Sequence, residues 1–385
     1  MKKILSLLLA VSLALPILTF GTQKSSAKEY PFDLDAKSAI LMDASTGTVL
    51  YEKNADAALP PASVTKIMTL LLVMEAIDSG AVLPGDKVSV SEAASGMGGS
   101  QVYLEPGETL TVEELIKCVV IASANDAAYA LAEHVAGSEE AFVQRMNERA
   151  KDLRMVNTHF ENTNGLDDSV TEHLTSARDI AIMSRELLRH PMILSYTTIW
   201  QDTIRDGAFT LTNTNRLVRF YPGATGLKTG STSKALFCIS ATAERDGMHL
   251  IAVVMGAPTR DIRNAEAKKL LDYGFSGYSV YHAKEEDLGT LKVSGGKGAE
   301  VALEGKEGAI LLEKGQERRI TTRKVLPKTV TAPIAAGDVV GYVEYTVDEK
   351  VVGRCDIVAC EDVERVSYTD LILQLLRGML GVFSA

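Results

Sequence analysis

A serine and a lysine stand one helical turn apart at Ser63 and Lys66, within the apolar stretch LPPASVTKIMTLLLVMEA (residues 59–76). On a helix, positions i and i+3 share a face, so the two side chains can come within hydrogen-bonding distance. Burial disfavours an ammonium and lowers its pKa, which makes lysine a usable general base near neutral pH. The pair therefore predicts a nucleophilic serine at the start of a helix, where developing negative charge is favoured. The plain alternative is a helix-capping serine beside a lysine whose stem reaches water.

The four-residue pattern alone carries little information, because it begins at four serines of this chain: Ser25, Ser63, Ser231 and Ser294. Only the copy at Ser63 starts an apolar helix. A second polar group follows in IASANDAAYA, where Ser123 and Asn125 stand at the join of two helical segments. Their hydroxyl and carboxamide offer proton relay and amide recognition from one short loop. The structural alternative is a helix N-cap formed by Asn125 or Asp126.

A third group is Lys228-Thr229-Gly230, followed by Ser231, which leads into an apolar strand in GLKTGSTSKALFCIS. A lysine and a hydroxyl at a strand edge can hold a carboxylate. Gly230 permits a substrate backbone to approach closely, and the same edge offers backbone N–H groups. A single Lys-Thr-Gly is more often an ordinary charged turn, so the prediction depends on all three groups occurring together.

The three groups follow one another in the order Ser63, Ser123 and Lys228, 60 and then 105 residues apart. In this combination the chain resembles the active-site-serine penicillin-recognising enzymes, which carry Ser-x-x-Lys, Ser-Asp-Asn and Lys-Thr-Gly. It resembles more narrowly the D-alanyl-D-alanine carboxypeptidases, the low-molecular-mass penicillin-binding proteins of serine peptidase family S11. The stretches SAILMDASTGTVLYEKN, NTHFENTNGLDD and SARDIA add to a resemblance that covers essentially the whole mature chain.

The resemblance implies a catalytic role for four side chains. Ser63 would attack the carbonyl between the two terminal D-alanines of a peptidoglycan stem peptide and become an acyl-ester, and Lys66 would accept its proton as general base. Ser123 would help pass a proton to the departing D-alanine amine, while Asn125 would orient the substrate and Lys66. Water would then release the shortened peptide, and β-lactam antibiotics would block the site covalently.

The resemblance also implies how the substrate is held. Lys228 and Thr229 would bind the terminal carboxylate, next to Gly230. The backbone N–H groups of Ser63 and Ser231 would form the oxyanion hole. Some relatives carry a histidine where this chain has Ser231, but a position that contributes only its N–H should tolerate this change.

A serine β-lactamase is the nearest alternative, because it shares all three motifs. Class A enzymes add a glutamate that activates the deacylating water, and no Glu-x-x-Leu-Asn stretch occurs between Ser123 and Lys228. An alternative of a different class is a membrane-tethered cell-wall binding protein whose site is silent, although none of the motif residues is degraded.

Helices and strands of one α/β domain are expected to position these groups. SAILMDASTGTVLYEKN predicts a β-hairpin, and apolar spacing predicts helices at TVEELIKCVVIAS, NDAAYALAEHVAG, SEEAFVQRMNERAKDL and SARDIAIMSRELLRH. In the last helix Ser176 and Asp179 resemble a capping box, so Arg178 and Asp179 are interpreted as structural. From about residue 207 the strands AFTLTNT, ALFCISATAE and HLIAVVMGA follow. Strands at both ends, with helices between them, predict an α/β sandwich whose sheet joins the N- and C-terminal parts.

With the family resemblance, the expected fold is the penicillin-binding, β-lactamase-like transpeptidase fold, an antiparallel sheet packed by helices. A small all-β C-terminal domain and a terminal amphipathic helix are expected to follow it. The expected segments are a signal peptide at 1–27, a serine D,D-peptidase catalytic domain at 28–284, a β-rich domain at 285–363 and a membrane-anchoring helix at 364–385.

Both ends of the chain carry apolar segments. Lys2 and Lys3 precede ILSLLLAVSLALPILTF, and SSA ending at Ala27 fits a signal-peptidase site. This predicts export to the outer face of the bacterial cytoplasmic membrane and the cell wall, with a retained transmembrane anchor as the alternative. At the other end, a narrow stripe of polar or small residues marks an otherwise apolar helix: Asp370, Gln374, Arg377, Gly381 and Ser384. Such a helix could lie in a membrane interface, or dock on the protein itself or on a partner.

Composition excludes several other classes of function. The 385 residues carry a formal net charge of −10, and removal of residues 1–27 would take away only lysines among the charged groups. Nucleic-acid binding requires a basic face, so it is not expected. Four cysteines (Cys118, Cys238, Cys355 and Cys360) are too few for a disulfide framework, although a Cys355–Cys360 bridge stays open. With no CxxC or HExxH pattern, no metal or other cofactor is expected.

Overall fold

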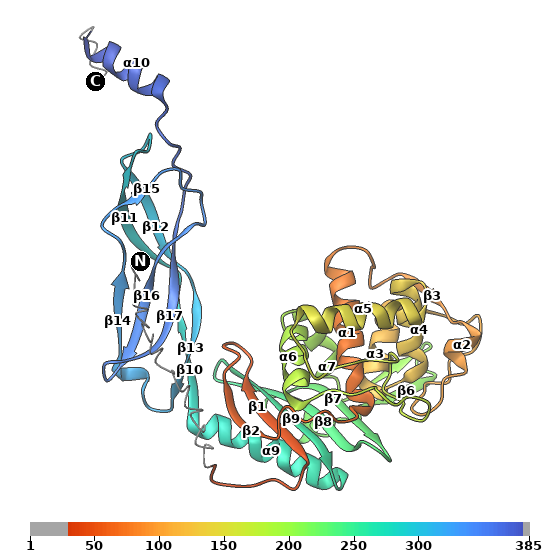
Figure 1. Ribbon diagram of the computed structural model, residues 1–385. Coiled ribbons are helices and arrows are strands. Elements are labelled where there is room, and N and C mark those ends of the chain that lie inside the picture. The colour runs from red at the N-terminus through yellow and green to blue at the C-terminus, as the bar shows by residue number, and fades with distance from the viewer. Residues whose placement is uncertain (1–29, 380–385) are drawn as a thin grey trace, which may run out of the picture. The chain divides into compact units, whose positions relative to one another are not determined.

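The computed structural model describes residues 30–379 of the chain. The predicted signal peptide at 1–27 lies outside the described residues, and so does the end of the predicted terminal helix, positions 380–385. Figure 1 shows the arrangement of the helices and strands.

A five-stranded antiparallel sheet, in the order β2-β1-β9-β8-β7, forms the centre of the first part of the chain. Its strands are β1 (Ser38–Asp43), β2 (Val49–Lys53), β7 (Ala224–Thr232), β8 (Leu236–Arg245) and β9 (Met248–Ala257). β1 lies beside β9, with Ile40 opposite Val253, so the sheet joins segments far apart in the sequence. This confirms the predicted sandwich.

Helices cover both faces of this sheet. In Figure 1, α9 lies against one face and the other helices of this part lie on the opposite side. The long helices are α1 (Lys66–Asp78), α3 (Val112–Lys117), α4 (Asn125–Ala136), α5 (Glu139–Asp152), α6 (Ala177–Leu187) and α9 (Arg260–Gly277). The short ones are η1 (Ala62–Thr65), α2 (Glu92–Ser95), the π-helical η2 (Cys118–Ala122), η3 (Pro191–Ile193), α7 (Leu194–Thr197) and α8 (Leu217–Phe220). Two small hairpins complete this part: β3 (Lys87–Ser89) with β4 (Thr109–Thr111), and β5 (Gln201–Ile204) with β6 (Phe209–Thr212).

The apolar patterns follow from this layering. Covered on both faces, β9 has a nearly continuous run of buried residues instead of an alternating one. α1 crosses the centre of the helical layer, and most of its residues from Lys66 to Met74 are buried, so it has almost no polar face. The α1 backbone is therefore held on several sides by the core, which fixes the position of the residues at its N-terminus.

The predicted capping box at the start of α6 forms only in half. The Ser176 hydroxyl accepts from the Asp179 N–H at 3.1 Å. The Asp179 carboxylate does not return to Ser176, because it accepts from the Asn157 N–H at 2.9 Å and the Thr158 hydroxyl at 2.8 Å. Arg178 pairs with Asp56 and Glu52, so both residues have the structural roles predicted for them.

A β-rich part with a hydrophobic core of its own follows. Its six-stranded sheet has the order β14-β16-β17-β12-β11-β15, and β10 pairs with β13. The strands are β10 (Tyr278–Ala283), β11 (Glu286–Ser294), β12 (Glu300–Gly305), β13 (Gly308–Glu313), β14 (Ile320–Val325), β15 (Val330–Thr331), β16 (Val339–Val347) and β17 (Lys350–Ala359), with a 3-10 turn η4 (Glu317–Arg319). Because the partner of β10 belongs to this part, we propose that the domain boundary lies before Tyr278 and not at 284.

The last element of the described residues is α10 (Tyr368–Met379). Within residues 30–379, no helix has the length and apolar character needed to cross a membrane. All four cysteines are free, Cys360 exposed and the other three buried, so Cys355 and Cys360 are not bridged.

Candidate active site

Ser63 and Lys66 meet at the junction of η1 and α1. The Lys66 ammonium nitrogen Nζ lies 2.9 Å from the Ser63 hydroxyl oxygen. Ser63 belongs to the 3-10 turn, and the α-helix itself begins at Lys66. A 3-10 turn before an α-helix is common, but the predicted i, i+3 spacing still brings the two side chains together, since residues three apart are eclipsed in such a turn.

Lys66 is fully buried, and protein atoms use each of its hydrogen-bonding positions. Besides Ser63, its Nζ contacts the Asn125 side-chain oxygen at 2.6 Å and the Asn164 carbonyl oxygen at 2.9 Å. None of these three partners is charged. Burial lowers the pKa of Lys66 well below its ordinary value, and the nearby charge of Lys228 lowers it further, against an opposing effect of Asp126. The amine is thereby made available as a base.

Ser123 and Lys228 form the second contact of the site. Ser123 ends η2 in a left-handed conformation with φ of 63°, and its hydroxyl accepts from Lys228 Nζ at 2.7 Å. Lys228 also donates to the Thr229 carbonyl oxygen at 2.9 Å and is almost completely buried. Burial, with the nearby charge of Arg263, lowers the pKa of Lys228 to about 7. An ordinary lysine would be fully charged at neutral pH, whereas this one is close to its midpoint.

The outer strand of the sheet, β7, carries the third group. Gly230 packs against η1, since a Cβ at this position would lie 2.9 Å from both the Pro61 carbonyl oxygen and the Ser63 nitrogen. A side chain there would push the strand away from Ser63. The glycine therefore allows η1 and β7 to pack closely. From the sequence, Gly230 was explained only by the close approach of a substrate backbone. Thr229 donates to the Thr214 hydroxyl at 2.9 Å, and Ser231 is exposed.

Asn125 connects this site to the glycine-rich loop at 95–108. Its side-chain amide donates to the Gly98 carbonyl oxygen at 2.6 Å, and its backbone N–H donates to the Ser100 carbonyl oxygen at 2.7 Å. Asn125 is also the first residue of α4 and is buried. The side chain thus has a fixed amide orientation, with its oxygen toward Lys66.

A second loop holds the opposite side of Lys66. Asn164 supplies its carbonyl oxygen from this loop, and Gly165 packs so tightly that a Cβ would lie 1.9 Å from the Ala62 carbonyl oxygen. His173 anchors the loop to η1: its Nδ1 accepts from the Glu161 N–H at 3.0 Å, so Nε2 carries the proton and donates to the Thr65 hydroxyl at 2.8 Å. Burial lowers the pKa of His173 to about 4, and the imidazole is neutral at pH 7.

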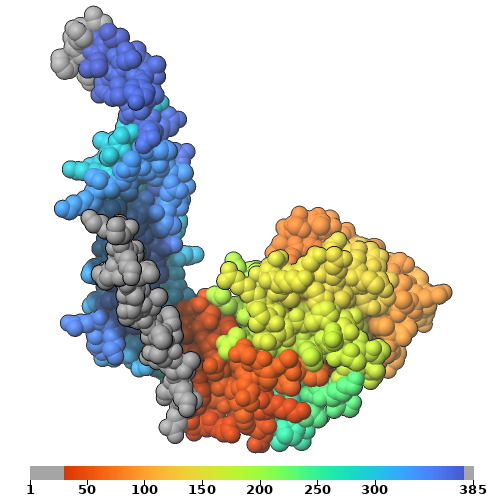
Figure 2. Space-filling view, in the orientation of Figure 1, coloured from red at the N-terminus to blue at the C-terminus, as the bar shows by residue number. Residues whose placement is uncertain are grey.

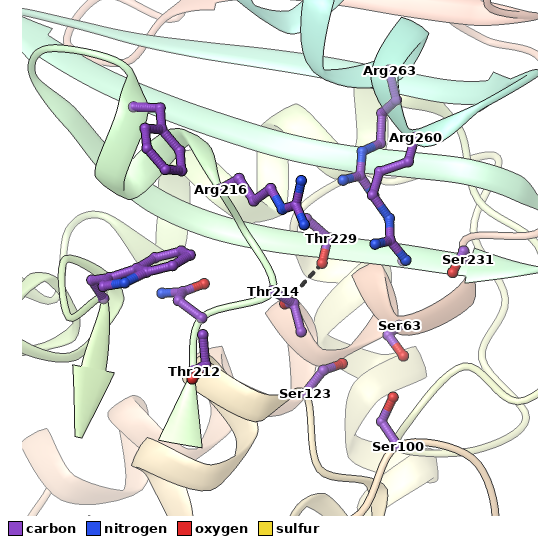
Figure 3. A pocket seen from close by; sticks show the side chains of 14 residues that line it. Ser63, Ser100, Ser123, Thr212, Thr214, Arg216, Thr229, Ser231, Arg260 and Arg263 are labelled. Atoms are coloured by element: carbon purple, nitrogen blue, oxygen red, sulfur yellow. Dashed lines mark hydrogen bonds between the residues drawn. The ribbon is translucent and has the colours of Figure 1, made fainter. Parts of the chain in front are cut away.

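The groups open into one pocket of about 630 Å³. Figure 3 shows Ser63, Ser123, Thr229 and Ser231 around this pocket, with Thr214 and Thr212 leading away from Ser63. The lining residues are Ser63, Ser100, Ser123, Trp200, Thr212, Asn213, Thr214, Arg216, Phe220, Thr229, Gly230, Ser231, Arg260 and Arg263. Three predicted site residues do not line the pocket but contact residues that do: Lys66 contacts Ser63, Asn125 contacts Ser100 and Lys228 contacts Ser123.

Three arginines of the pocket were not found by sequence reasoning: Arg216, Arg260 and Arg263. Arg216 precedes α8, and the other two stand on the first turn of α9, in a stretch that contains none of the three motifs. Arg263 is almost completely buried, and burial together with Arg260 lowers its pKa to about 10. No acidic side chain lines this pocket among the described residues, so the arginines make it a site for an anionic group.

Residues 22–259 match the family described as D-alanyl-D-alanine carboxypeptidase, and residues 275–365 match the C-terminal domain of penicillin-binding protein 5. The chain is 41% identical over 379 residues to the D-alanyl-D-alanine carboxypeptidase DacF of Bacillus subtilis (strain 168), with 96% of each chain covered. Among solved structures, penicillin-binding protein 5 from Haemophilus influenzae is similar with a TM-score of 0.78 and 32% identity, covering 88% of this chain and 100% of that one. Penicillin-binding protein D2 from Listeria monocytogenes in the ampicillin-bound form has a TM-score of 0.59 and 33% identity, over 64% of this chain and 100% of that one.

Proposed function

Because the chain belongs to the D-alanyl-D-alanine carboxypeptidase family, it is a serine-type D-Ala-D-Ala carboxypeptidase, and we propose that Ser63 is its nucleophile. The observation that carries this assignment is the contact between the Ser63 hydroxyl and the amine of Lys66, which is fully buried and has no charged hydrogen-bond partner. A neutral amine 2.9 Å from a hydroxyl is in position to take its proton.

Acylation follows from these contacts. Ser63 Oγ attacks the carbonyl carbon of the bond between the two terminal D-alanines of a peptidoglycan stem peptide, and its proton passes to Lys66 Nζ. The backbone N–H groups of Ser63 and Ser231 stabilise the oxyanion as the tetrahedral intermediate forms. When the C–N bond breaks, the Ser123 hydroxyl gives its proton to the leaving amine and is reprotonated with the proton that Lys66 took from Ser63, which leaves Lys66 neutral again. The hydrogen bond from Lys228 fixes the Ser123 hydroxyl as an acceptor, so its own proton is free to point at the substrate.

The terminal carboxylate of the substrate binds at Lys228 and Thr229, next to Gly230. The arginines of the pocket support this assignment, because an acidic chain would otherwise repel an anionic substrate. Arg263 in particular is buried and has no carboxylate partner in the described part of the chain. Asn125 holds the acyl part of the peptide and keeps Lys66 in place.

Deacylation distinguishes this function from that of a β-lactamase. Water must attack the Ser63 ester, and class A β-lactamases use a glutamate for this step. Two acidic side chains of the loop next to Lys66 have other partners: Glu161 accepts from two backbone N–H groups of that loop, and Asp167 accepts from the Thr232 hydroxyl. With no carboxylate among the described residues of the pocket wall, activation of the water is left to Lys66. The peptidyl ester has lost its D-alanine and is open to this water, whereas the amine released from a β-lactam ring stays tethered in the site, so a penicilloyl ester at Ser63 persists. Penicillin therefore acts as an inhibitor, consistent with the ampicillin-bound structure of the Listeria relative.

Release of D-alanine from a pentapeptide tests this function. The full chain should release one D-alanine per peptide, and Ser63→Ala should abolish the release while leaving the thermal melting temperature nearly unchanged. Ser294→Ala is the matched control, because Ser294 begins another Ser-x-x-Lys copy but lies on β11, outside the pocket. If Ser63→Ala retained D-alanine release, the nucleophile assignment would be wrong.

We further propose that the protein is exported after cleavage at Ala27 and that α10 rests in the membrane interface. The described leucine and isoleucine side chains of α10 are exposed, from 47% for Leu371 to 68% for Leu375. Figure 2 shows this helix, in the darkest blue, at the surface. Burying these side chains among lipid tails would contribute more than charge, since Asp370 and Arg377 are the only charged residues in the sequence of α10.

Flotation with phosphatidylcholine vesicles tests the membrane proposal on the full mature chain. The unmodified chain should float with the vesicles, and Leu375→Lys should abolish flotation. Leu83→Lys is the control, because Leu83 is also exposed, at 58%, but lies in the catalytic part. Equal flotation of Leu375→Lys and the unmodified chain would refute insertion of α10.

A further inference from the structure

One end of the active-site pocket carries two aromatic side chains that the proposed reaction does not use. Trp200 and Phe220 line the pocket together with Thr212 and Asn213. The two aromatic rings meet edge to face, with 6.0 Å between their centroids. Phe220 is 60% exposed, and aromatic side chains that line a concave site are typical of ligand-binding pockets.

This aromatic end lies on the far side of the carboxylate site from Ser63. Figure 3 shows Thr214 and then Thr212 leading away from Ser63 and Thr229. Trp200 lies next to Thr212. It directly precedes β5, in which Gln201 pairs with Thr212, and its carbonyl oxygen accepts from the Asn213 N–H at 2.9 Å. A substrate whose carboxylate is at Thr229 therefore has its terminal residue, and not its acyl part, nearest to these rings.

The aromatic end is held in place as a wall. The Arg219 guanidinium lies over both rings, 5.5 Å from the centroid of Trp200 and 5.7 Å from that of Phe220. Two hydrogen bonds fix Asn213 in the same hairpin, one through its backbone and one from its side-chain amide to the Ile199 carbonyl oxygen at 2.8 Å. A stacked cation and a hydrogen-bonded hairpin limit the freedom of the rings, so they present a pre-formed apolar surface.

We propose that Trp200 and Phe220 form a subsite for the side chain of the terminal D-residue, and that this subsite accepts apolar side chains larger than the methyl group of alanine. The inference rests on the proposed function, because it takes the carboxylate to bind at Lys228 and Thr229. The leaving residue departs as a free D-amino acid, by the same bond cleavage as D-alanine. The arginines of the pocket disfavour a basic side chain here, since no acidic residue lines the pocket wall in the described chain.

Peptides that differ only in the last residue test the subsite on the full mature chain. Diacetyl-L-Lys-D-Ala-D-Xaa is supplied with D-Ala, D-Leu, D-Glu or D-Lys at the end, and the released D-amino acid is quantified. The unmodified chain should release D-Leu with a kcat/KM within about tenfold of that for D-Ala, and should discriminate against D-Lys by about a hundredfold. Trp200→Ala and Phe220→Ala should each lower the D-Leu to D-Ala ratio of kcat/KM by about tenfold.

Leu83→Ala is the matched control, because it removes an equally exposed apolar side chain outside the pocket and should leave the ratio unchanged. Phe220→Ala keeps the test valid if Trp200→Ala fails to fold, since the Phe220 side chain is mostly exposed. If neither folded variant changed the ratio by more than about twofold, or if D-Glu were preferred over D-Leu, the subsite would be refuted. D-Ala release by the unmodified chain in the same experiment shows that the proposed function stands even then.

Trp200 also supplies a direct binding signal, because it is the chain's single tryptophan. In the Ser63→Ala variant, which should bind without turnover, the peptide ending in D-Leu should change the tryptophan fluorescence more than the peptide ending in D-Ala. Equal changes with the two peptides would contradict contact between the terminal side chain and this ring.

Discussion

Asn125→Asp places a negative charge where the structure has a neutral oxygen 2.6 Å from Lys66 Nζ. A carboxylate in contact with a lysine favours the charged amine and raises its pKa by about 1 to 3 units. Each unit removes a factor of about ten from the neutral fraction at a pH below the pKa. If Lys66 must be neutral to take the Ser63 proton, acylation at pH 7 should fall to the extent that the raised pKa exceeds 7, by up to about 1000-fold.

The acylation rate with a fluorescent penicillin, measured from pH 5 to 10, reports this change. In the unmodified chain the rate should rise with pH as Lys66 loses its proton. In Asn125→Asp the midpoint of this rise should move to higher pH by about 1 to 3 units, so that part of the lost rate returns at high pH.

Asn125→Ala is the matched control for this experiment. Both substitutions remove the hydrogen bond from the Asn125 amide to the Gly98 carbonyl oxygen, but only the aspartate adds a charge. Asn125→Ala should therefore lower the rate at all pH values without moving the midpoint upward. Identical profiles for the two variants would refute the argument that Lys66 acts as a neutral base.

Three further predictions concern stability. The native pKa of Lys228, about 7, lies below its ordinary value, so burial of this amine lowers the free energy of unfolding at low pH. This loss is recovered only as pH rises from about 7 to 10.5. In urea titrations at pH 6, Lys228→Met should therefore raise the free energy of unfolding by about 1–3 kcal/mol, and it should abolish D-alanine release. The native pKa of His173, about 4, is also below its ordinary value, so the stability that the neutral imidazole contributes is complete above pH 6.5 and is lost as pH falls through 4. Between pH 7 and pH 4 the unmodified chain should lose roughly 3 kcal/mol of unfolding free energy from this residue. His173→Asn should not show this part of the loss. Gly165→Ala should lower the melting temperature and the acylation rate, because its Cβ would lie 1.9 Å from the Ala62 carbonyl oxygen, whereas Gly85→Ala, with open space around it, should change neither. For Lys228→Met and His173→Asn, a difference in unfolding free energy from the unmodified chain that does not change with pH would contradict these predictions. An unchanged melting temperature and acylation rate in Gly165→Ala would contradict the third.

The sequence predicts the fold well where local patterns and burial agree. The helix periods around α4, α5 and α6 and the apolar runs of β8 and β9 identify these elements, and the family resemblance supplies their order in the sheet. Features that depend on tertiary contacts could not be predicted from the sequence. The α-helix starts at Lys66 and not at Ser63, and Asp179 leaves its capping role because Asn157 and Thr158 offer donors from a distant loop.

Some residues of the site could be predicted from the sequence and others could not. Residues in short motifs, such as Ser63, Ser123 and Lys228, are found because the motif and its context lie together in the sequence. The arginines and the Trp200–Phe220 wall come from separate loops and helices with no motif of their own, and only the folded chain brings them into one pocket. The contact from Asn164 to Lys66 uses a backbone carbonyl, which any residue carries, so the side-chain type gives no signal for it.

We propose that a buried amine makes the Ser63 hydroxyl nucleophilic, so a penicillin should attach covalently to this side chain alone. Intact-mass analysis of the folded mature chain after penicillin treatment should show one adduct per chain, and peptide mapping should place it on the peptide that contains Ser63. No adduct on a demonstrably folded chain, or an adduct on a different serine, would contradict the account.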